Sequence, residues 1–178
     1  MARGPMRGTR AANSIVLRPE QVRAICRYNQ RLFERYLRFL ARRSHREGAR
    51  DRGTAHGSWI RTLSHVLNVQ EAWLVYIVQD RLDELASIRS MPYRSPKTWA
   101  GVRAYSRRVW GEIGAWTRTV APTDLRHRVR APWMPRDCTV SDGVMQATLE
   151  EAHHLGEVIG TLWQTEREPP EMTWIMLG

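Results

Sequence analysis

A four-helix bundle, an all-α fold, is the architecture expected for this chain of 178 residues. Four long segments repeat apolar residues at the i, i+3, i+4, i+7 spacing of amphipathic helices. Segments rich in proline or polar residues separate them, and one of these is a long irregular crossover between the third and fourth helices. The length suffices for one hydrophobic core, and a hydrophobic content of 42% excludes a disordered chain.

The first helix is expected to begin near Pro19, and the second is expected to follow a polar break over residues 44–57. Ser58 is a suitable N-cap for the second helix, which should run through Ile77 and end before Met91–Pro92. The core stripe of the first helix comprises Val22, Ile25, Cys26, Leu32, Phe33, Tyr36 and Leu40.

Ser95–Pro96 predicts the start of the third helix, because a capping residue precedes a proline at the first helical position. Pro122 closes that helix. The crossover over Arg128–Cys138 contains two prolines and is interpreted as an extended loop or a short hairpin.

The last helix should span Val140–Thr165, because Thr139 and Asp142 have the spacing of a capping box with aspartate in place of glutamate. An apolar tail, Met172–Leu177, could pack back on the bundle. Residues 1–13 are expected to be a flexible basic tail, and residues 14–178 to form the bundle domain.

The net charge of +10 makes nucleic acid a candidate partner, and Lys97 is the only lysine. This partner is not favoured, because the arginines are spread along the whole chain without a nucleic-acid-binding motif. No run of 18 apolar residues exists, so no membrane partner is expected. Cys26 and Cys138 lack metal-type spacing and are expected to be thiols of a cytoplasmic protein.

The most informative stretch is the last helix, which carries Glu150, Glu151, His153 and His154. Charges near an apolar helix face are costly unless they are paired, and a metal ion is one partner that could pair them. Glu150 and His154 lie about 40° apart at i, i+4, and His65 of the second helix can complete a three-ligand site. Such a site leaves positions open on Zn, Ni, Fe, Co or Mn.

Neighbouring residues of that helix have other expected roles. His153 lies about 100° from His154, so it is only an alternative ligand. Glu151 falls inside the apolar arc, where it either orients a ligating histidine or pairs with an arginine. His45 and His56 lie in the polar segment and are expected at the surface without a role.

Three segments of the chain resemble the DinB/YfiT-like superfamily of metal-binding four-helix bundles, over about residues 14 to 166. They are Arg27–Gln30, then Thr62–Val66 followed by Glu71 and Trp73, and finally Glu150–Glu157.

The resemblance implies a metal triad of one histidine on the second helix and two on the fourth. His65 and His154 match two of those positions, and Glu150 stands where the family has its third histidine. A carboxylate there would shift the metal preference toward Fe, Mn or Zn.

By the same resemblance, the chain is expected to be a metal-dependent enzyme whose ion activates a low-molecular-weight thiol or water toward a small-molecule substrate. Thiol-transferase or hydrolase chemistry would fit, with His153 or Glu157 as a nearby acid or base. The alternative is a non-catalytic, stress-related basic bundle that binds a protein or nucleic acid. Bundles of this type often pair, so a homodimer is also expected.

Overall fold

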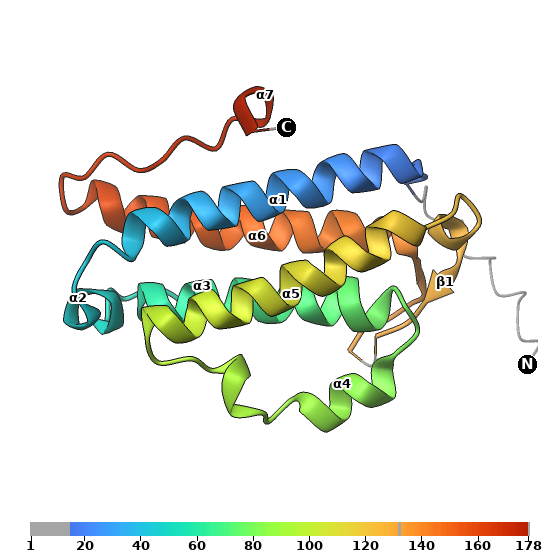
Figure 1. Cartoon of the computed structure of the whole chain (residues 1–178), viewed down its shortest axis with the longest axis horizontal. Coiled ribbons are helices and arrows are strands. Elements are labelled where there is room, and N and C mark those ends of the chain that lie inside the picture. The colour runs from blue at the N-terminus through green and yellow to red at the C-terminus, as the bar shows by residue number, and fades with distance from the viewer. Residues whose placement is uncertain (1–14, 132, 178) are drawn as a thin grey trace, which may run out of the picture.

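The computed structural model describes residues 15–131 and 133–177 and is almost entirely helical (Figure 1). The all-α expectation is confirmed. Four long helices make up the bundle: α1 (Pro19–Leu40), α3 (Trp59–Gln70), α5 (Trp99–Thr119) and α6 (Val140–Trp163). The basic tail expected over residues 1–13 lies outside the described residues.

The bundle is closed by contacts between all four long helices. α3 packs against α5 and α6, and α1 covers the opposite sides of the same two helices (Figure 1). The apolar stripes that predicted the helices meet at the centre, where burial of large side chains supplies most of the stabilisation. The largest fully buried side chains are Trp59, Tyr36, Phe33, Leu32, Leu40, Ile60, Leu63, Leu67, Leu74, Ile77, Ile113 and Leu125.

α6 begins where its capping residues predicted. The Asp142 backbone N–H donates to the Thr139 hydroxyl oxygen at 3.1 Å, and the Thr139 N–H donates to the Asp142 carboxylate at 2.9 Å. Two of the otherwise unpaired donors at the helix start are thereby satisfied. The capping box fixes the register of the helix that carries His154.

The expected second helix is not a single α-helix. α3 continues directly into a π-helix, η1 (Glu71–Ile77), followed by α4 (Leu82–Ile88) and a 3₁₀ turn, η2 (Pro92–Arg94). A π-helix has more residues per turn and is common at functional sites. Here the wider turn rotates the directions in which the side chains after Gln70 point. Glu71 comes to lie in the core with only 1% of its surface exposed.

The expected start of the third helix at Pro96 is wrong by three residues. α5 begins at Trp99 with Thr98 as its N-cap, and the Gly101 N–H donates to the Thr98 hydroxyl at 3.1 Å. Ser95 instead ends η2. Both residues are good caps by type, so sequence alone does not choose between them.

The polar segment between the first two long helices contains a short helix, α2 (His45–Ala49), which the apolar pattern did not predict. Ser44 caps it by accepting from the Glu47 N–H at 3.2 Å. The remaining residues of the segment form a compact turn that leads into α3.

The crossover contains a 3₁₀ turn, η3 (Asp124–Arg126), and two short antiparallel strands, β1 (Arg128–Val129) and β2 (Cys138–Thr139). The short hairpin is therefore confirmed. The apolar tail packs on α1, as expected, and ends in α7 (Trp174–Leu177). The Tyr28 hydroxyl donates to the Met172 carbonyl at 3.0 Å. Among the described residues, no helix is long and apolar enough to cross a membrane.

Candidate metal centre

Three histidines from separate segments converge at one side of the bundle. His65 lies on α3, His154 on α6, and His56 in the turn between α2 and α3. Each offers a ring nitrogen within 4.8 Å of those of the other two. The ring centroids of His56 and His65 are 3.8 Å apart, and that of His154 lies 4.5 Å from His65 and 4.9 Å from His56.

The turn that carries His56 is held in place by its neighbours. Gly57 adopts φ +75°, a left-handed conformation that favours glycine. The Arg52 N–H donates to the Gly57 carbonyl at 2.7 Å, and the Arg52 guanidinium stacks 3.4 Å above the Trp59 ring. These contacts tie the turn to the start of α3 and direct His56 toward His65.

The electrostatics favour neutral imidazoles at His56 and His65. Burial, together with the neighbouring His56 and His154, lowers the pKa of His65 from 6.5 to about 4. Burial and His154 also lower the pKa of His56. A neutral imidazole has a free lone pair, which is the form that binds a metal ion.

His154 is flanked by two carboxylates of its own helix. Its Nδ1 lies 3.1 Å from Glu157 Oε2, and its Nε2 lies 3.6 Å from Glu150 Oε2. Burial opposes ionisation of Glu157, but the hydrogen bond and charge of His154 outweigh it and lower the Glu157 pKa. When His154 carries a single proton, on Nδ1 toward Glu157, its Nε2 lone pair is free, as in many histidines that ligate metals.

Of the expected triad, the structure brings His65 and His154 together and places Glu150 beside His154. Glu150 belongs to neither group of described residues whose ligand atoms all lie within 4.8 Å. Its other carboxylate oxygen accepts a hydrogen bond from Gln146 at 2.8 Å. The third member of the close cluster is His56, and the second such group is His153, His154 and Glu157.

The expectation that His56 lies at the surface is therefore corrected, because its side chain is half-buried against His65 and His154. Helical periodicity says nothing about a residue in a turn, so no apolar stripe pointed to it. The signal that was present is local: Gly57 permits a sharp turn, and Ser58 caps α3 by accepting from the Arg61 N–H at 3.3 Å. Together they hold His56 at the N-terminal end of α3, the helix that carries His65.

Glu151 has a partner that neither sequence-based alternative named. It is 1% exposed, and its Oε2 accepts from Gln70 Nε2 at 2.7 Å. Its other carboxylate oxygen has no hydrogen-bond partner among the described residues. Burial raises the Glu151 pKa well above 4.5 and so favours the protonated carboxyl. His153 is exposed, with its ring centroid 4.9 Å from that of His154.

The donor set of the cluster suits a divalent transition metal. Tetrahedral Zn–N bonds of about 2.0–2.1 Å place ligand nitrogens about 3.3 Å apart. The three ring nitrogens lie within 4.8 Å of one another, so small side-chain rotations bring them to that spacing. Imidazole nitrogen also suits Ni, Fe and Co, so the cluster does not select one ion.

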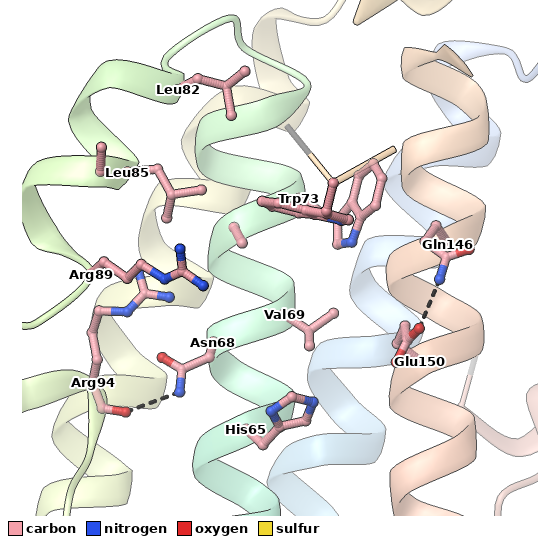
Figure 2. Close-up of a pocket in the computed structure, with 13 residues that line it drawn as sticks. His65, Asn68, Val69, Trp73, Leu82, Leu85, Arg89, Arg94, Gln146 and Glu150 are labelled. Atoms are coloured by element: carbon pink, nitrogen blue, oxygen red, sulfur yellow. Dashed lines mark hydrogen bonds between the residues drawn. The ribbon is translucent and has the colours of Figure 1, made fainter. Parts of the chain in front are cut away.

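Two cavities meet at this cluster. One, of about 380 Å³, lies between α3, α4 and α6 (Figure 2), and a more polar one, of about 620 Å³, lies beside the His56 turn. His65, Asn68 and Arg94 border both. A small molecule in either cavity would touch the histidine cluster.

A buried polar network supports the wall between the cavities. Glu71 of the π-helix lies 2.8 Å from Arg94 Nη1 and accepts from the Tyr105 hydroxyl at 2.6 Å. Asn68 donates to the Arg94 carbonyl at 3.0 Å. The π-helix thus turns a carboxylate inward to neutralise an arginine that is 7% exposed.

Comparison with known protein families gives a match over most of the chain. The model of the DinB superfamily matches residues 28–158 of this chain. That range contains His56, His65, Glu150 and His154. No protein with a curated description shows significant similarity to the chain.

Proposed function

Because the chain belongs to the DinB superfamily, we propose that it binds a divalent metal ion and acts as a metal-dependent transferase or hydrolase on a small molecule. The observation that carries the proposal is the convergence of His56, His65 and His154 from three segments of the chain. Zn, Ni, Fe and Mn are the candidate ions, since all accept imidazole with carboxylate ligands.

A divalent ion held there would supply a nucleophile at neutral pH by lowering the pKa of a coordinated thiol or water. Two carboxylates beside the ion have different roles. Glu157 fixes the orientation and tautomer of His154 through Nδ1. Glu150 lies on the Nε2 side, where it acts either as a fourth ligand or as the acceptor of the nucleophile's proton.

The test combines metal content with activity. Purified, untagged protein is analysed by plasma mass spectrometry and assayed for thiol transfer and ester hydrolysis, beside His65→Ala and His154→Ala. We expect near-stoichiometric metal and measurable turnover in the wild type, and loss of both in the variants with helical circular dichroism unchanged. Stoichiometric metal in both variants would reject the histidine centre, and metal without turnover would reject the enzymatic part.

Glu150→Ala distinguishes its two roles in the same experiment. Loss of metal would identify a ligand, whereas retained metal with reduced turnover would identify a proton acceptor. Glu34→Ala is a matched control, because Glu34 lies on α1 and lines neither of the two cavities at the histidine cluster.

The second candidate is the non-catalytic bundle, and one surface feature favours it. Six arginines of α1 and the residues just after it recur at three- and four-residue spacing, within about 120° of the helix circumference. They are Arg23, Arg27, Arg31, Arg35, Arg38 and Arg42. Such a stripe can follow a row of phosphates.

Salt dependence tests this candidate. Fluorescence anisotropy of a labelled DNA duplex is measured at increasing salt for the wild type and for the double variant Arg27→Gln, Arg38→Gln. A partner bound through the stripe predicts affinity that falls steeply with salt, and a shallower slope in the variant. Equal slopes would remove the stripe as a nucleic-acid surface.

A further inference from the structure

The cavity between α3, α4 and α6 has the size and position of a small-molecule site. Its volume of about 380 Å³ falls in the range of ligand pockets. His65 borders it from α3 and Glu150 from α6, while α4 forms the opposite wall (Figure 2). A ligand inside would therefore reach the histidine cluster with one end.

Most of the cavity lining is apolar. Trp73 stands over the space between α3 and α6, and Leu82 and Leu85 extend the apolar surface toward α4 (Figure 2). Such a lining favours a hydrocarbon or aromatic body, because its transfer from water is favourable. The apolar side chains are Val69, Ala72, Trp73, Leu82, Leu85, Ala86 and Trp133.

Two arginines border the cavity on the α4 side, and only one of them is neutralised. Arg94 is 7% exposed and forms an ion pair with Glu71 at 2.8 Å. Arg89, at the C-terminal end of α4, is exposed and makes no ion pair or hydrogen bond with any described residue. In Figure 2 both guanidinium groups lie across the cavity from Glu150.

We propose that this cavity binds a small amphipathic anion, with an apolar body against Trp73 and the α4 leucines and a carboxylate on Arg89. A planar guanidinium pairs well with a carboxylate through two parallel N–H donors. The anionic end of the ligand then lies at α4, and its other end lies at His65 and Glu150. Arg89 is a binding residue that determines specificity by charge.

The arrangement also orients the ligand. Glu150 repels the carboxylate from the α6 side, and Arg89 attracts it to the α4 side. A cationic ligand of the same shape would meet the unneutralised guanidinium of Arg89 at the α4 wall, beside Arg94 and its ion-pair partner Glu71. The substrate class rests on the proposed metal-dependent function, but binding in the cavity needs no metal ion.

The experiment compares three ligands of one shape by isothermal titration calorimetry on the full chain: 4-phenylbutanoate, 4-phenylbutanamide and 4-phenylbutylamine. We expect the carboxylate to bind about tenfold tighter than the amide, and also tighter than the amine, which Arg89 repels. Arg89→Gln should remove the preference for the carboxylate. Arg107→Gln is the matched control, because Arg107 is an exposed arginine that borders neither cavity.

A second variant tests the cavity itself. Ala86 is an exposed residue of α4 that borders the cavity, so Ala86→Trp should fill it without disturbing the core. We expect this variant to weaken binding of all three ligands. Equal affinity for carboxylate and amide, no saturable binding of the carboxylate, or full binding by Ala86→Trp would overturn the proposal.

Repeating the titrations after treatment with a chelator separates this proposal from the proposed function. Carboxylate preference that depends on Arg89 in metal-free protein supports the cavity assignment, even if the untreated protein contains no metal. Stoichiometric metal in a protein that binds the carboxylate and the amide equally would reject the cavity assignment but support the metal centre.

Discussion

His56 is the residue that changes the interpretation of the site most. It adds a third imidazole to His65 and His154, within 4.8 Å of both. The expected third ligand, Glu150, has a carboxylate oxygen 3.6 Å from His154 Nε2. At the position on α6 where the resemblance implies a third histidine, this chain has Glu150, and its third clustered histidine lies in the turn before α3.

His56→Ala is expected to weaken zinc binding at least tenfold. Loss of a residue that only hydrogen-bonds to a metal ligand already lowers metal affinity by about 10–100-fold. The measurement is competitive titration of metal-free protein against a chromophoric chelator. His45→Ala is the control, because His45 lies in the same segment but outside the cluster. Equal affinities of wild type and His56→Ala would exclude His56 as a ligand.

The contribution of His65 to the stability of the metal-free protein should decrease as pH falls from 6.5 toward 4. The pKa of His65 is lowered from 6.5 to about 4, so the unfolded chain binds more protons in this window. Stability therefore rises with pH there, and His65→Gln should reduce that rise. Urea unfolding at several pH values gives the free energy of unfolding of the wild type and of the variant, and the difference between the two measures the effect.

The comparison of wild type with His65→Gln is needed because Glu151 changes the free energy of unfolding with pH in the opposite direction. Its pKa is raised by burial, so its contribution favours the folded state below pH 4.5 and is lost as pH rises. A wild-type curve identical in shape to that of His65→Gln would contradict the lowered pKa of His65.

At the scale of elements, the long helices were predictable because each carries a continuous apolar stripe and a recognisable start. α1 begins at Pro19 and α6 at Val140, as the sequence indicated. α2 and the π-helix were not foreseen. A helix of five residues carries too little periodicity to detect, and a π-helix depends on packing that the sequence pattern does not encode.

The residues of the site were predictable only where they lie on long periodic helices. His65 and His154 lie on strongly periodic helices, so their faces could be assigned. His56 depends on the path of a turn, and the partner of Glu151 depends on how α3 and α6 pack. Gln70, which donates to Glu151, is fully buried between these helices, although its type suggests the surface.

The close approach of α6 to the π-helix depends on Gly143. A Cβ at this position would lie 2.8 Å from Val78 Cγ1 and 3.3 Å from Trp73 Cε3. Gly143→Ala should therefore lower the free energy of unfolding by about 1–3 kcal/mol through overpacking. Urea denaturation monitored by circular dichroism gives the value.

Gly160→Ala is the matched control on the same helix, because no atom lies within 4 Å of a Cβ there. It should raise the free energy of unfolding by up to about 1 kcal/mol, since alanine has the higher helix propensity. A Gly143→Ala variant as stable as Gly160→Ala would show that α6 can shift away from the π-helix at little cost.

At the scale of the whole molecule, the outer face of α6 is the surface best suited to the expected homodimer. Leu149 and Trp163 are 60% and 59% exposed, and Gly156 and Gly160 lie between them on the same face. Small residues between large apolar ones let two helices approach closely, and a two-fold dimer would bury this face against itself.

The double variant Leu149→Glu, Trp163→Glu is therefore expected to be monomeric under conditions where the wild type sediments as a dimer. Sedimentation velocity makes the comparison, with Ile175→Glu as a control, since Ile175 is also strongly exposed but belongs to the C-terminal tail. A wild-type monomer would reject the dimer, and a dimeric double variant would reject this face as its interface.

His56, His65 and His154 are proposed to hold one metal ion together. The most direct test is an anomalous difference map from crystals of the metal-loaded protein, collected at the absorption edge of the bound metal. We expect one strong peak about 2.0–2.1 Å from a ring nitrogen of each histidine. A map without such a peak, or with the peak on His153 and Glu157 away from His56 and His65, would contradict the account.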